Sequence, residues 1–563
     1  MKMENNIPLK EYPRPQFIRD SYLCLNGIYQ YAFRDSDDFP IKYDGDILVP
    51  YSPESPLSGV NRVLTPHEYL FYYKEITFPK GFVKDIVIIH FEAIDQIADI
   101  YFNDKLYIHH VGGFLPFEIK IDKKDIKDIN IIKIRVKDYT DTSYYSRGKQ
   151  KLKRGGIWYT PQSGIYMPVW AESVNNGYIE KIKYTPDIDD SSLIVNITSA
   201  LSKSVVILEN KEIEIENNKD VVIRIDNPHL WDIEDPYLYK VVIKNKVDKI
   251  DSYFAMRKFS TIEVDGFKRL ALNNKPIFMK GVLDQGYFDK GMLTPRSYED
   301  YQKDINLVKE LGFNTIRKHI KIESPIFYHY CDINGIIVWQ DMVNGGTTYK
   351  FSTIAFPLIT HIHHKDTNYK KFARSDNEGR KEALEEYKET INLLYNVPSI
   401  ALWTIFNEGW GQFDSINVYN ELSKLDNTRL FDHASGWHDQ GISDVKSLHV
   451  YFTKVKMPKE KYVKNRSIIL SECGGYNLEV KGHKFSDTNF GYKYMDNEEE
   501  LIAQYAKFIS RDILINIPKG LSAFIYTQLS DVEDELNGFI TYDREVVKVD
   551  INKIKALNDE VHL

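Results

Sequence analysis

The fold of this chain is decided by two stretches of sequence, Ser399-Ile-Ala-Leu-Trp-Thr-Ile-Phe-Asn407-Glu408 and Ser467-Ile-Ile-Leu-Ser471-Glu472. Each is a short apolar run that ends in a glutamate, and glycine follows soon after, at Gly409 in the first and at Gly474 and Gly475 in the second. Such runs are typical of buried parallel strands. Because a buried carboxylate is costly to desolvate unless it is paired or used, the two strand ends predict a paired-carboxylate site.

Around these two stretches, residues 259–563 alternate between strand-like and helical segments, which indicates βαβ units and a parallel sheet. Eight units favour a (β/α)8 TIM barrel with insertions, and a doubly wound sheet is the alternative. In the barrel, Glu408 follows the fourth strand and Glu472 ends the seventh, at the face where barrel active sites lie. Helices are expected at 298–311 and 376–394, and a loop over the barrel mouth after residue 342. The expected strands are 277–283, 313–318, 336–340, 400–407, 429–433, 447–451, 468–472 and 522–528.

The part of the chain before the barrel reads as all-β. Short alternating segments recur over residues 1–174, separated by turn signals, and they favour a jelly-roll β-sandwich. A second, smaller run of strands over residues 175–258 has the spacing of an immunoglobulin-like β-sandwich. The chain is therefore expected to be a multidomain protein with two sandwiches followed by a barrel.

Composition excludes several classes. Of the 563 residues, 43% are hydrophobic and 27% charged, as in an ordinary soluble protein, and the net charge of −8 argues against nucleic-acid binding. The three cysteines have no CxxC spacing, which argues against a disulfide framework. The sequence has no apolar run of signal or membrane-span length, so we expect a cytoplasmic protein without a membrane partner. The aromatic content of 13% suits sugar stacking, but also sandwich cores.

Hydrolysis of a glycoside is the reaction that best explains two carboxylates at strand ends. One carboxyl must be protonated to donate to the leaving oxygen, and the other ionised to attack the anomeric carbon. From the residues alone the two roles are interchangeable, and two ordinary salt-bridged glutamates are the alternative. Near Glu408, Asn407 offers an amide for a sugar hydroxyl and Trp410 an indole wall.

Several ordered motifs resemble glycoside hydrolase family 2, the family of β-galactosidases, β-glucuronidases and β-mannosidases. The resemblance covers nearly the whole chain, including the sandwiches. The motifs are Tyr12-Pro-Arg-Pro-Gln16, Gly155-Gly-Ile-Trp158-Tyr-Thr-Pro-Gln-Ser163-Gly-Ile-Tyr166, Asn227-Pro-His-Leu-Trp231, Phe313-Asn-Thr-Ile-Arg317-Lys-His319, Val338-Trp-Gln-Asp341, Asn407-Glu408 and Ser471-Glu472.

The resemblance implies a retaining mechanism in which Glu472 is the nucleophile and Glu408 the acid/base. It also implies that Asn407 binds the 2-hydroxyl of the sugar. Arg317 would hold Glu472 ionised, with a salt bridge elsewhere in the barrel as the alternative. Tyr451 would donate to Glu472, with a rim aromatic as the alternative.

Other candidates also lie near strand ends. Asp284 could bind a sugar hydroxyl, although a purely structural role in its loop is nearly as plausible, and His319 follows the second strand. Trp437 could form a wall of the pocket and Tyr526 its floor. The histidines at positions 361, 363 and 364 favour a polar loop over a metal site, and no cofactor or metal ligand set is evident.

The identity of the sugar is inferred from a position where this sequence differs from a motif of the family. In family β-glucuronidases an Asn-x-Lys motif binds the uronic carboxylate, and the matching place here reads Glu535-Leu-Asn537. An acidic Glu535 argues against a uronide and favours β-galactosidase, although other basic residues could reach the pocket. β-Glucuronidase, β-mannosidase and a catalytically silent carbohydrate-binding protein stay open. The expected partner is a small-molecule glycoside or oligosaccharide, and a homo-oligomer is possible.

Overall fold

The computed structural model describes residues 7–360 and 362–563, so His361 of the expected polar loop lies outside the described residues. Eight parallel strands form one sheet in the order β27-β26-β25-β24-β23-β32-β29-β28, and β27 and β28 at its two ends contact each other. The sheet is a nearly closed barrel, which confirms the predicted (β/α)8 barrel over the doubly wound alternative. The strands are Met279–Asp284 (β23), Thr315–Lys318 (β24), Ile337–Asp341 (β25), Ile400–Thr404 (β26), Leu430–Asp432 (β27), Val445–Val450 (β28), Ser467–Gly474 (β29) and Leu521–Thr527 (β32).

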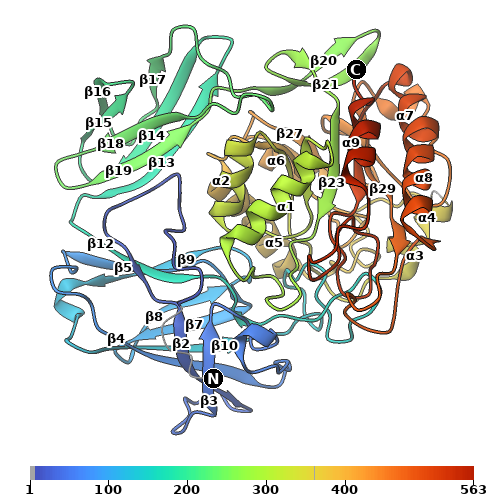
Figure 1. Ribbon diagram of the computed structural model, residues 1–563. Helices are drawn as coiled ribbons and strands as arrows, with labels where there is room; N and C mark the ends of the chain where they lie inside the picture. The colour runs from blue at the N-terminus through green and yellow to red at the C-terminus, as the bar shows by residue number, and fades with distance from the viewer. Residues whose placement is uncertain (1–6, 361) are drawn as a thin grey trace.

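Helices connect the barrel strands and surround the sheet (Figure 1). The segment after β25 begins as a loop, as the sequence predicts, and then contains the two one-turn helices α3 and α4. Pro357 begins α4, a position where its missing N–H is harmless. The helices are Tyr298–Glu310 (α1), Pro325–Asn334 (α2), Phe351–Ile354 (α3), Pro357–Thr360 (α4), Asn377–Leu394 (α5), Ser415–Leu422 (α6), Glu460–Val463 (α7), Glu498–Phe508 (α8) and Ile551–Asp559 (α9).

One end of the barrel interior is an apolar core. Met279, Trp339 and Ile525 belong to a single buried cluster there. The small sheet of Phe259–Val264 (β20), Phe267–Leu272 (β21) and Lys275–Pro276 (β22) contributes Leu270 to the same cluster. This packing closes the end of the barrel that lies opposite the carboxyl ends of the strands.

The N-terminal region contains two antiparallel sheets packed face to face, drawn in blue and cyan in Figure 1. Alternate residues of Asn130–Lys137 are buried, as expected for strands with one face in a core, and both sheets contribute to one apolar cluster. The first sheet consists of Gly45–Val49 (β3), Gly27–Arg34 (β2), Tyr69–Ile76 (β4), Asn130–Lys137 (β10), Ile97–Phe102 (β7) and Lys105–Val111 (β8). The second consists of Leu23–Cys24 (β1), Val169–Val174 (β12), Ile86–Phe91 (β5) and Phe117–Asp122 (β9).

A second, smaller pair of antiparallel sheets follows, drawn in green in Figure 1, and shares another apolar cluster. The two pairs of sheets agree with the predicted sandwiches. Their strands are Ile179–Asp187 (β13), Ser192–Ser199 (β14), Lys203–Leu208 (β15), Lys211–Glu216 (β16), Val221–Arg224 (β17), Tyr239–Lys244 (β18) and Lys249–Phe254 (β19).

A loop of the N-terminal region reaches the mouth of the barrel. The backbone N–H groups of Arg147 and Gly148 donate to the Asn344 carbonyl, at 3.0 and 3.1 Å. Asn344 lies just beyond β25, at the carboxyl ends of the strands. Within the described ranges, none of the helices has both the length and the apolar character that crossing a membrane requires.

Candidate active site

Local backbone irregularities place both glutamates at the barrel mouth. In β29 the pairing with β28 passes from Leu470 directly to Glu472, so that Ser471 is an extra residue and the strand bulges. Glu408 has a φ of 51°, a left-handed conformation that is uncommon for residues other than glycine. Backbone of this kind costs free energy and persists only where the surrounding structure holds it in place. It is found most often at functional sites.

The two carboxyl groups lie close together around His449. One carboxylate oxygen of Glu408, one of Glu472 and a ring nitrogen of His449 are all within 4.8 Å of one another. His449 Nδ1 is 2.8 Å from Glu408 Oε1 and 3.6 Å from Glu472 Oε2. The paired-carboxylate arrangement expected from the strand ends is therefore present in the folded chain.

Glu472 is surrounded by donors. Arg317 Nη1 donates to its Oε1 at 3.0 Å, and the Tyr451 hydroxyl donates to its Oε2. Burial by itself raises the pKa of Glu472, but the charges of His449 and Arg317 and the hydrogen bond from Tyr451 outweigh it and lower the pKa to about 2. At neutral pH this carboxyl is ionised, which is the state that a nucleophile needs.

Glu408 lies in a different environment. Burial is the largest influence on its pKa and raises it above the ordinary value for glutamate. The hydrogen bond from His449 opposes this rise, and the nearby negative charge of Glu472 adds to it. A carboxyl with a raised pKa suits a general acid.

Arg317 connects the nucleophile candidate to the neighbouring strand ends. Its guanidinium makes a two-pronged ion pair with Asp341, at 3.0 and 2.9 Å, and donates to Asn407 Oδ1 at 2.8 Å. Since its oxygen is bound by Arg317, Asn407 keeps its amide nitrogen for other partners. Among the described residues that nitrogen is buried and has no hydrogen-bond partner. His319 Nδ1 is hydrogen-bonded to Asp341 Oδ2, one of the two oxygens that Arg317 binds, at 2.7 Å.

The two predicted tryptophans lie beside Glu408. Trp437 Nε1 donates to the Glu408 carbonyl at 3.0 Å, so Trp437 supports the backbone that carries this carboxyl. The Trp410 ring lies 6.1 Å from the His319 ring and 5.1 Å from that of Trp158, which comes from the N-terminal region. Within the described chain, Trp410 Nε1 is buried without a hydrogen-bond partner. A sugar hydroxyl would complete its bonding.

Asp284 and Tyr526 are less free to meet a ligand. Asp284 accepts from Lys318 Nζ and from the Gly286 backbone, both at 2.8 Å. Tyr526 is 1% exposed and packs 4.6 Å from the Phe539 ring, in the main apolar core of the barrel. Both residues lie at strand ends as expected, but their contacts in the chain are structural ones.

Two residues of the site were missed by the sequence reasoning. His449 lies two residues before Tyr451, and strand alternation alone puts both side chains on the same face. Lys149 arrives from the N-terminal region, and its signal is a stretch, 147–154, in which five of eight residues are basic. Neither residue lies next to a glutamate in sequence, so only the fold brings them to the carboxylates.

Glu408, His449 and Glu472 have the spacing of a metal site. A second set with such spacing consists of His483, Asp543 and Glu545. In the first set, both oxygens of Glu472 already accept hydrogen bonds, from Arg317 and Tyr451. A guanidinium in that position would repel a cation, so the first set does not suit a metal ion.

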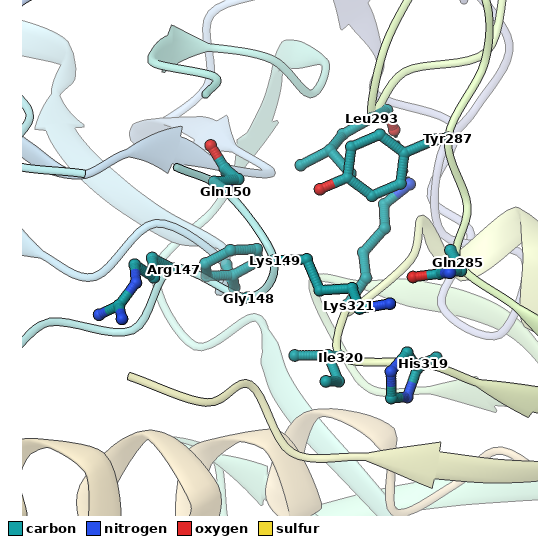
Figure 2. Close-up of a pocket in the computed structure, with 11 residues that line it drawn as sticks. Arg147, Gly148, Lys149, Gln150, Gln285, Tyr287, Leu293, His319, Ile320 and Lys321 are labelled. Carbon is teal, nitrogen blue, oxygen red and sulfur yellow. Dashed lines mark hydrogen bonds between the residues drawn. The ribbon is translucent and has the colours of Figure 1, made fainter. Parts of the chain in front are cut away.

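A small cavity lies at the barrel mouth (Figure 2). Its volume is about 10 Å³, which is close to the room that one water molecule occupies. Lys149 and Gln150 of the N-terminal region line it together with Gln285, His319 and Lys321 of the barrel. The barrel mouth is therefore shared between the two regions.

Two sandwiches and a barrel with paired glutamates at its strand ends define the class of two-carboxylate glycoside hydrolases. Family models bear this out: the TIM barrel domain of glycosyl hydrolases family 2 matches residues 262–557, and a further family 2 model matches residues 177–257. The chain belongs to glycoside hydrolase family 2.

Relatives with assigned names include a β-galactosidase of Thermoanaerobacter pseudethanolicus, 26% identical over 72% of this chain and 53% of its own length. A putative β-glucuronidase of Formosa agariphila is 25% identical over 60% of this chain and 39% of its own length. The chain spans about half the length of the curated relatives it matches.

Solved structures resemble the whole chain. The β-D-glucuronidase of Dictyoglomus thermophilum aligns with a TM-score of 0.74 at 21% identity, covering 98% of this chain and 99% of its own. A family 2 β-galacturonidase from Eisenbergiella tayi bound to galacturonate aligns with a TM-score of 0.71 at 16% identity, over 98% and 99%. At these identities the likeness shows a shared fold.

Proposed function

We propose that this chain is a retaining exo-β-glycosidase that hydrolyses terminal β-linked sugars through a covalent glycosyl-enzyme intermediate. The observation that carries the proposal is the closeness of the two carboxyl groups, which have one oxygen each within 4.8 Å. Retaining enzymes hold their carboxyls roughly 5–5.5 Å apart, and inverting enzymes roughly 6.5–9.5 Å apart. The unequal pKa shifts of the two groups support the same conclusion.

In the first step, Glu472 attacks the anomeric carbon while the bond to the leaving oxygen breaks and Glu408 gives that oxygen its proton. In the second step, Glu408 takes a proton from water, the water oxygen bonds to the anomeric carbon, and the bond to Glu472 breaks. Arg317 and Tyr451 keep Glu472 ionised and oriented. Asn407 would donate from its unpaired amide to the sugar 2-hydroxyl.

For the sugar, we propose a β-galactoside. The support is the charge around the pocket: Glu535 is 1% exposed and lies near Lys149 and Tyr159 at the barrel mouth. A buried carboxylate there opposes a second carboxylate on the sugar. A relative named β-galactosidase agrees with this choice.

β-Glucuronidase is the second candidate. Lys149 brings an ammonium group to the barrel mouth, and a uronic carboxylate would be attracted to it. A relative is named putative β-glucuronidase, and similar folds carry that name. The two candidates differ in whether Glu535 or the substrate is the partner of Lys149.

The purified protein, assayed with the 4-nitrophenyl β-D-galactoside, β-D-glucuronide, β-D-mannoside and β-D-glucoside, tests both parts of the proposal. We expect preference for the galactoside and loss of turnover in Glu408→Ala and Glu472→Gln. Preference for the glucuronide or the mannoside would overturn the sugar. Absence of turnover with all four, together with measurable sugar binding, would point to a silent carbohydrate-binding protein.

A further inference from the structure

Lys149 is a residue of the N-terminal region that lies at the barrel mouth. Its loop is attached to the barrel by the two backbone hydrogen bonds from Arg147 and Gly148 to Asn344. The Lys149 side chain is 7% exposed and extends toward Gln285 and His319 (Figure 2). A buried ammonium needs partners, because its desolvation is costly.

The partner of Lys149 is Glu535, in the segment that follows β32. Lys149 Nζ lies 3.8 Å from Glu535 Oε2 and 3.4 Å from the Tyr159 hydroxyl. The same carboxylate oxygen accepts hydrogen bonds from the Tyr159 hydroxyl and from Gln285 Nε2, the latter at 3.2 Å. Cation and anion are both buried, and as a pair they add no net charge to this part of the barrel mouth.

This ion pair lies near Glu408. Lys149 Nζ is 5.8 Å from the centre of the Trp410 ring, two residues beyond Glu408. The charge of Lys149 is also among the influences that lower the pKa of Glu408 and, after burial, of His319. A sugar bound at Glu408 would therefore lie within electrostatic reach of Lys149.

Several side chains around the pair have polar atoms that no partner satisfies. Among the described residues, the buried atoms without a hydrogen bond include Gln285 Oε1, Asn537 Nδ2, Asn407 Nδ2 and Trp410 Nε1. Gln285 and Asn537 are joined through Gln528, whose amide contacts both, at 2.6 and 2.7 Å. Buried polar atoms are normally satisfied, and sugar hydroxyls supply both donors and acceptors.

We infer that the Lys149–Glu535 ion pair is the specificity-determining element of this site, and that it makes the pocket accept a sugar hydroxyl and reject a sugar carboxylate. The inference rests on the proposed glycosidase function. Glu535 already neutralises Lys149, so a uronic carboxylate would meet the negative charge of Glu535 without gaining a free cation. A neutral hydroxyl is not repelled by Glu535. The specificity for a neutral sugar then comes from repulsion of the uronic acid.

A purely structural role is the competing explanation, since the same two segments are joined by a second ion pair. Arg154 Nη1 lies 3.0 Å from Asp534 Oδ1, next to Glu535 in sequence. Arg154 is about one third exposed, at 32%, and no contact to the catalytic carboxyls is recorded for it or for Asp534 within the described residues. Asp534→Asn is therefore a matched control that loosens the same attachment without freeing Lys149.

The test compares the kcat/KM values of the full-length enzyme for 4-nitrophenyl β-D-glucuronide and β-D-galactoside. In Glu535→Gln we expect the glucuronide-to-galactoside ratio to rise about tenfold or more, because Lys149 becomes an unpaired cation. The double variant Lys149→Met/Glu535→Gln should lose that gain, and Asp534→Asn should keep the wild-type ratio. An unchanged ratio in folded Glu535→Gln, or an equal rise in Asp534→Asn, overturns the inference.

If Glu535→Gln does not fold, Lys149→Gln provides the opposite test. Glu535 is then an unpaired anion, and the inhibition constant of D-glucuronate should rise relative to that of D-galactose. An unchanged ratio of the two constants overturns the inference. Wild-type enzyme that turns over none of the four glycosides refutes the proposed function instead, and wild-type preference for the glucuronide refutes both the sugar and the role of the pair.

Discussion

The end of β29 and the backbone beyond β26 each carry a buried glutamate, but the groups around the two side chains differ. Glu472 accepts from Arg317 and Tyr451, whereas the side chain of Glu408 is hydrogen-bonded to His449 Nδ1. Burial raises the pKa of both carboxyls, and only at Glu472 do the neighbouring charges reverse the shift. The strand ends bring the two carboxyls together, and the surroundings of the two carboxyls shift their pKa values in opposite directions.

Replacing each glutamate in turn should have the largest effect on activity and should show which of the two is the nucleophile. We expect Glu472→Gly to lose about 10⁴-fold or more in kcat, because no other group can form the covalent intermediate. Azide should restore turnover of 4-nitrophenyl β-D-galactoside, with the inverted glycosyl azide as the product. In Glu408→Gly the intermediate still forms, so azide should give the azide of retained configuration. Nuclear magnetic resonance of the products distinguishes the two.

The opposite pattern of products would exchange the two roles. Inverted azide from Glu408→Gly and retained azide from Glu472→Gly would make Glu408 the nucleophile. Thermal unfolding of each variant serves as the control for a folded protein.

Arg317→Lys should change the pKa of Glu472, at the end of β29, and leave that of Glu408 unchanged. Lysine keeps a positive charge but cannot make the forked contacts of the guanidinium. The pKa of Glu472 should therefore rise in this variant. We expect kcat/KM to fall about 10²-fold and its acid limb to move to higher pH, with the alkaline limb unmoved.

Arg429→Lys is the matched control, since Arg429 is a buried barrel arginine paired with Asp426 at 3.1 Å. That variant should keep both limbs of the pH profile. If Arg317→Lys left the acid limb in place, Arg317 would not be the group that holds Glu472 ionised.

His449→Asn should have the smallest effect and should act on both carboxyls at once. The hydrogen bond from His449 lowers the pKa of Glu408, and its charge lowers the pKa of Glu472. Without the imidazole both pKa values rise, so both limbs of the kcat/KM profile should move to higher pH, with about a tenfold loss at the optimum.

A shift of one limb only in His449→Asn would show that the imidazole serves a single carboxyl. His433→Asn is the control, because the contacts of His433 are with Ser443 and Asp439 and not with the two glutamates. It should leave the pH profile unchanged.

Much of this arrangement was accessible from local sequence pattern. The eight predicted barrel strands all overlap observed ones, and the runs before Glu408 and Glu472 correspond to β26 and β29. Arg317 and Tyr451 lie at other strand ends, and Asn407 directly precedes Glu408. The family resemblance implies their roles, and the structure gathers them around the same two glutamates. Apolar periodicity predicts the strands and where they end because each strand must bury its own side chains, whatever lies elsewhere in the chain.

The barrel, the two antiparallel regions before it and the pair of glutamates at the strand ends could all be read from the order of the amino acids. The surroundings of those glutamates could not, because they depend on how the chain folds in three dimensions. The bulge at Ser471 depends on pairing with neighbouring strands, and Lys149 meets Glu535 only because a loop of the N-terminal region is held across the barrel mouth. The Lys149–Glu535 contact joins segments hundreds of residues apart, and its energy depends on burial and distance, which no local pattern records.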